Sequence, residues 1–117
     1  MIFTAPDVDD FAAVEAALTD AFRRAQEAAR AAEPIVFVLR NEHLLGQRGA
    51  PGAMLANALL SGVRTLAAEG HAANAIASGE DATPEDVQHW IALLAEGRGV
   101  AGELIHVGAK HVGKVQA

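Results

Sequence analysis

The chain has 117 residues, a formal net charge of -6 and a sequence pI of about 5.2. This length fits one small domain, and we expect residues 1–117 to form it. An acidic chain is poorly suited to bind a nucleic acid or an anionic membrane. The absence of Cys excludes disulfides and thiolate metal sites. Aspartates at positions 7, 9 and 10 come too early for a signal peptide, so we expect a cytoplasmic protein.

The first part of the chain predicts a strand over residues 2–5, a helix over 11–33 and a strand over 35–39. Large apolar residues recur in the helix at a spacing that gives it one apolar face. Pro34 ends the helix, because the residue before a proline disfavours helical dihedrals. The run from 35 to 39 is apolar throughout and predicts a strand that is covered on both faces, as in a parallel sheet.

The second part predicts a loop over 41–52, a helix over 51–69, a weak strand over 72–77 and a last strand over 103–107. We expect Gly62, inside the helix, to lie where another backbone passes close. Thr83 and Pro84 have the pattern of a helix start, with a capping hydroxyl and a proline at the first helical position. The apolar residues that this last helix is expected to bury are Val87, Trp90, Ile91 and Leu94.

Strands and helices therefore alternate along the chain. This alternation predicts the α/β class, with a small parallel sheet of about four strands and helices on both faces. Such an arrangement is half of a Rossmann-like, doubly wound fold. The strand over residues 2–5 would lie at an open edge of that sheet, where unpaired backbone groups invite pairing with another chain.

Short segments in the right order resemble the short-chain dehydrogenase/reductase family. Residues 73–79 are similar to the family's V-N-A-I-A-P-G, and residues 100–108 to its T-G-q-x-x-x-V-d-G ending. Further similar segments are residues 18–22, 34–39, 49–52, 66–69 and 83–87. The resemblance covers nearly all of this chain but only the second half of such an enzyme, and it implies a truncated domain of that fold.

The departures from the family concern its chemistry. The Gly-rich turn that cradles the dinucleotide has no counterpart here, so no cofactor is expected. The family's catalytic Asn and Ser align with Ala17 and Arg40. Its Tyr position falls between Gly52 and Met54, and its Lys position falls between Ala56 and Ala58. The sequence contains no Tyr at all, so the family's proton transfer has no phenol donor. We expect no catalytic, cofactor-binding or metal-binding residue.

In the family, two long helices form a four-helix bundle with a second subunit, and the last helix and strand form a second interface. The resemblance therefore implies an inactive subunit that acts in assembly. Its partner would be a full-length, active dehydrogenase/reductase, as the non-catalytic subunit of an NAD(P)-dependent oxidoreductase complex, or a second copy of itself. The interface residues that it implies are Phe11, Val14, Leu18, Phe22, Met54, Leu55, Leu59, Val63, Trp90, Ile91, Leu104 and Ile105.

The alternative is a small-molecule binding or regulatory module for an acyl or nucleotide ligand. Ligands of α/β proteins bind at the carboxyl ends of strands, and the residues that would form this loop site are Arg40, His43, Asn74 and Ser78. An enzyme of unrelated chemistry would use Glu42 or His43. A metal site of Glu103, His106 and His111 is a further alternative, although solvent-facing histidines are the simpler interpretation.

Overall fold

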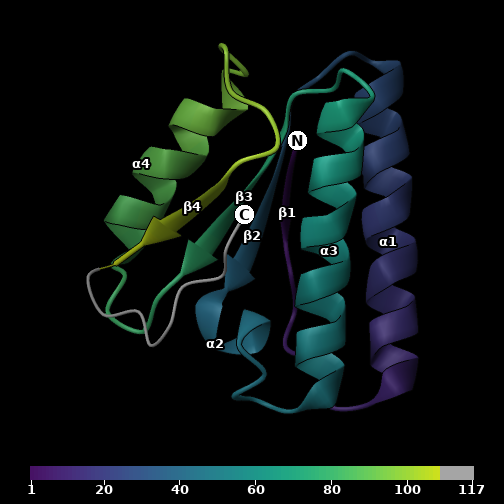
Figure 1. The fold of residues 1–117 in the computed structure, drawn as a ribbon, viewed down its shortest axis with the longest axis vertical. Helices are drawn as coiled ribbons and strands as arrows, with labels where there is room; N and C mark the ends of the chain where they lie inside the picture. The colour runs from purple at the N-terminus through teal and green to yellow at the C-terminus, as the bar shows by residue number, and fades with distance from the viewer. Residues whose placement is uncertain (109–117) are drawn as a thin grey trace.

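Four parallel strands form one sheet in the order β1-β2-β3-β4 (Figure 1). The computed structural model describes residues 1–108. The strands are β1 (Ile2–Thr4), β2 (Ile35–Arg40), β3 (Ala73–Ser78) and β4 (Leu104–Val107). The helices are α1 (Phe11–Arg30), α2 (Asn41–Leu44), α3 (Ala50–Ala68) and α4 (Pro84–Ala95). The predicted α/β class is therefore confirmed, with its small parallel sheet and with β1 at one edge.

Helices cover both faces of the sheet. The long helices α1 and α3 lie side by side on one face, and α4 lies on the other (Figure 1). Successive residues of a strand point to opposite faces. Accordingly, Phe37 and Leu39 join the core under α1 and α3, whereas Val36 and Val38 join the smaller core under α4. The two central strands are buried from both sides, as the unbroken apolar run in β2 predicts.

Local signals in the sequence set the helix ends. The Asp10 carboxylate accepts from the Ala13 backbone N–H at 2.8 Å, and the Thr83 hydroxyl accepts from the Asp86 N–H at 3.2 Å. Helix α1 ends at Arg30, three residues before the predicted end. The Glu33 N–H donates to the carbonyl of Ala28, and Ala32 adopts a φ of 51°. These features form a Schellman motif with alanine at the left-handed position.

Three aromatic side chains are exposed, and for Trp90 this differs from the predicted burial. Phe11 and Phe22 are 60% and 65% exposed, and Trp90 is 38% exposed rather than packed inward. Helix α1 instead buries one valine and three alanines, which are Val14, Ala17, Ala21 and Ala28. The predicted loop over 41–52 also contains the short helix α2. In an alanine-rich helix the large residues therefore do not by themselves identify the core-facing side.

Two neighbours on α3 test where the core begins. Leu55 is 1% exposed and Met54 is 54% exposed. We expect Leu55→Ala to lower the free energy of unfolding by about 2–5 kcal/mol, because it leaves a cavity. Met54→Ala should change it by only about 0.5 kcal/mol. Chemical denaturation of both variants checks this, and equal losses would contradict the placement of α3.

Candidate functional site

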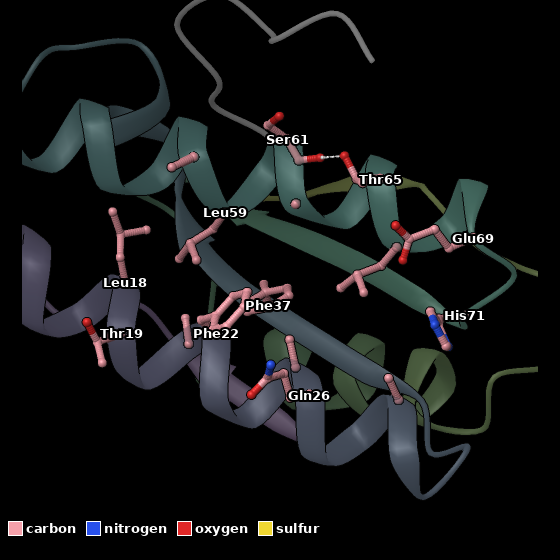
Figure 2. A pocket seen from close by; sticks show the side chains of 16 residues that line it. Leu18, Thr19, Phe22, Gln26, Phe37, Leu59, Ser61, Thr65, Glu69 and His71 are labelled. Carbon is pink, nitrogen blue, oxygen red and sulfur yellow. Dashed lines mark hydrogen bonds between the residues drawn. The ribbon is translucent and has the colours of Figure 1, made fainter.

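A groove of about 840 Å³ runs between α1 and α3 (Figure 2). Leu18 and Phe22 of α1 line one side, and Leu59 and Leu66 of α3 line the other. Phe37 of β2, which is only 3% exposed, lies at its base between the two helices. The groove therefore has an apolar floor and largely apolar walls, to which Gln26, Glu69 and His71 add polar groups.

Small residues keep the groove open. Ala21, Ala25 and Ala29 repeat every four residues along the groove side of α1. On α3, a Cβ atom added to Gly62 would meet no heavy atom within 4 Å. The expectation that another backbone passes close to Gly62 is therefore wrong, because this glycine faces open space in the groove.

Two of the hydroxyl groups along the groove are turned back onto their own helices. The Thr65 hydroxyl donates to the carbonyl of Ser61 at 3.1 Å, as Figure 2 shows. In the same way, the Thr19 hydroxyl donates to the carbonyl of Glu15 at 2.9 Å. Because these donors are already satisfied, they do not require a polar partner. The middle of the groove favours apolar contacts.

Phe22 is the largest exposed side chain along the groove. It lines the cavity and yet remains 65% exposed to water. Full burial of a phenylalanine side chain contributes about 1.5–3 kcal/mol. An exposed aromatic beside an apolar groove is typical of an interaction surface.

The interface residues that the resemblance implies fall into two groups. Six are accessible or partly accessible, namely Phe11, Leu18, Phe22, Met54, Trp90 and Ile105. The other six are under 9% exposed because they fill the chain's own core, namely Val14, Leu55, Leu59, Val63, Ile91 and Leu104. Apart from Leu59, which borders the groove, these buried residues have no surface to offer a partner. Their expected interface role is corrected accordingly.

A second cluster of polar groups lies at the carboxyl end of β2. The Arg40 Nη1 atom is 3.0 Å from the Asp7 carboxylate, and Arg40 also forms an ion pair with Glu42. The His43 Nε2 atom is 3.2 Å from the same Asp7 carboxylate. His43 is only 5% exposed, although it lies within the predicted loop over 41–52. Arg40 is already balanced by two carboxylates, which leaves little charge for an anionic ligand.

Asn74 does not belong to this cluster. It lies near the amino end of β3, is fully buried, and donates from Nδ2 to the carbonyl of Val100 at 3.0 Å. Its Oδ1 accepts from the Glu103 N–H at 3.1 Å. The amide thus anchors the segment before β4, and its expected place in a ligand loop is corrected. Ser78 does end β3 opposite Arg40 in the register, so these two residues share the carboxyl edge with His43.

Two further expectations concern metal ions and membranes. Within residues 1–108, no group of three His, Cys, Asp or Glu side chains could hold a metal ion. His111 lies outside the described residues. Within the same part of the chain, no helix has both the length and the apolar character that a membrane crossing requires.

No protein-family model matches the chain, and no curated protein matches it significantly. The groove therefore has to be interpreted from its own residues.

The small residues that form the groove were not predicted from the sequence, although a pattern that indicates them is present. Alanines at 21, 25 and 29, together with Ala58 and Gly62 on the later helix, repeat every four residues and mark a smooth helix face.

Gly62 gives a direct test of the open groove. We expect Gly62→Ala to raise the free energy of unfolding by about 0.5–1 kcal/mol, because alanine favours helix and nothing obstructs its methyl group. Gly97→Ala is the control. Gly97 has a φ of +64°, and an added Cβ would lie 2.6 Å from Pro34 Cγ, so this variant should be destabilised. Thermal unfolding of both checks the assignment, and a destabilised Gly62→Ala would contradict it.

Proposed function

We propose that this chain is a catalytically inactive, short-chain-dehydrogenase-like subunit whose role is assembly. It pairs through α1 and α3 with a full-length, active dehydrogenase/reductase or with a second copy of itself. The observation that carries the proposal is Phe22, which borders the apolar groove and is 65% exposed. Docking of another helix pair removes this ring from water.

The size of the surface supports this role. Helices of 20 and 19 residues are each about 30 Å long and pack about 10 Å apart. Together they offer a face of roughly 600 Å², close to the about 800 Å² that each partner contributes to a standard interface. Ridges of a partner helix fit the groove between α1 and α3. Burial of its apolar walls provides the main driving force, before the costs of association.

The residues at the family's catalytic positions support the lack of activity. Arg40 stands where the family has its serine, and it is engaged by Asp7 and Glu42. Ala56, within the region that aligns with the lysine, is 1% exposed and part of the core. The sequence has no Tyr to donate a proton. Neither a carbonyl-polarising hydroxyl nor a proton donor of the family's kind is available.

A charge placed on the groove tests the assembly role. Phe22→Glu should weaken association at least tenfold, because a buried carboxylate is costly to desolvate. Gln88→Glu adds the same charge to exposed α4, on the other face, and should leave association unchanged. Sedimentation equilibrium of the purified chain, alone and mixed with a dehydrogenase identified by co-purification from its host, measures both variants.

Two results would contradict the proposal. One is a chain that stays monomeric at high concentration and recovers no dehydrogenase from its host. The other is hydride transfer from a nicotinamide cofactor to a carbonyl compound, catalysed by the purified chain alone.

A further inference from the structure

The strand β1 has a free edge. It pairs with β2 through the register Ile2↔Val36, Phe3↔Phe37 and Thr4↔Val38, and within residues 1–108 no strand pairs with its other side. On the β2 side, the Met1 carbonyl accepts from Val36 N–H and the Ala5 N–H donates to the Val38 carbonyl, both at 2.9 Å. The backbone N–H and C=O groups of successive residues in a strand point to alternate sides. Those of Ile2 and Thr4 therefore point away from β2.

One side chain covers part of this edge. The Arg24 Nη1 atom of α1 donates to the Ile2 carbonyl at 3.5 Å. The guanidinium lies over the Phe3 ring, with Cζ 5.5 Å from the ring centroid. Asp20, one helical turn earlier, holds Arg24 Nε at 3.4 Å. One of the two outward carbonyl groups of β1 therefore already accepts a hydrogen bond from Arg24.

We propose that the outward edge of β1 is a pairing surface for β1 of a second copy and that Arg24 holds it closed. A second copy fits this edge because two β1 strands can match all of their outward backbone groups. In an antiparallel pair centred on Phe3, Ile2 of one copy lies opposite Thr4 of the other, and each such pair exchanges two hydrogen bonds. All outward groups of Ile2 and Thr4 in both copies then gain a partner. This pairing requires the Ile2 carbonyl, so it cannot form while Arg24 is bound there.

The strand combines features that permit such pairing with features that limit it. Ile2, Phe3 and Thr4 carry no charge, and Ile2 is 43% exposed. A long, uncharged edge is an aggregation hazard, and proteins blunt such edges with short strands and with cationic side chains. Here the strand has three residues, Pro6 follows it, and the cation comes from α1. The edge is separate from the α1–α3 groove, so this inference does not rest on the proposed function.

The test uses Phe22→Glu as the background, so that association through the groove is disabled. In that background, Arg24→Ala should lower the dimer dissociation constant at least about tenfold relative to Arg23→Ala, because one Ile2 carbonyl is freed in each of the two copies. Arg23 is also exposed on α1 but makes none of the three contacts of Arg24, so it controls for the loss of charge. Sedimentation equilibrium gives the constants, and circular dichroism verifies that both variants are folded.

Two further measurements locate the contact. Hydrogen exchange should show protection of the Ile2 and Thr4 amides in the dimer of the Arg24→Ala variant. Adding Thr4→Pro, which removes an outward N–H without touching the β2 ladder, should restore the weaker association. Equal dissociation constants for Arg24→Ala and Arg23→Ala would overturn the inference. Tighter association of Arg24→Ala without protection of those two amides would overturn it as well.

Discussion

The packing of α1 against α3, over the core that the two helices share, is the contact on which the rest of the structure depends. Helix α1 contributes Val14 and three alanines to this core, so it adds little side-chain volume there. The larger apolar residues of the helix, Phe11 and Phe22, are consequently left outside the core. This one feature explains both the smooth groove beside α3 and the exposed aromatic ring that borders it.

The carboxyl edge of the sheet differs from its helical face and from its free edge at β1. At the carboxyl edge, Asp7 pairs with Arg40 and His43, and Arg40 also pairs with Glu42, so these contacts join segments that are distant in sequence. On the helical face and at the free edge of β1, by contrast, apolar or backbone groups remain without a partner in the described residues. These surfaces are suited to contacts with other chains, which supports the proposed assembly role.

Sequence reasoning succeeded where one signal dominated. The apolar run of β2, Pro34 and the Thr83–Pro84 start placed strands and helices within a few residues. It was insufficient where two signals competed. The spacing of Phe11 and Phe22 indicated one apolar face of α1, whereas the alanines formed an equally regular face. Only packing in the folded chain decides which of the two faces is buried. The burial of His43 and of Asn74 depends on Asp7 and on the segment before β4, partners that no local pattern reveals.

The environment of the Phe22 ring in the assembled protein tests the central claim most directly. The chain has four phenylalanines, and fluorine labels on all of them can be followed together as the protein concentration rises or a partner is added. Phe3 and Phe37 are buried in the single chain and serve as internal standards for a ring without water contact. The account predicts that the Phe22 resonance loses its sensitivity to a soluble paramagnetic quencher on assembly. A Phe22 ring that stays fully accessible in the assembled state would contradict it.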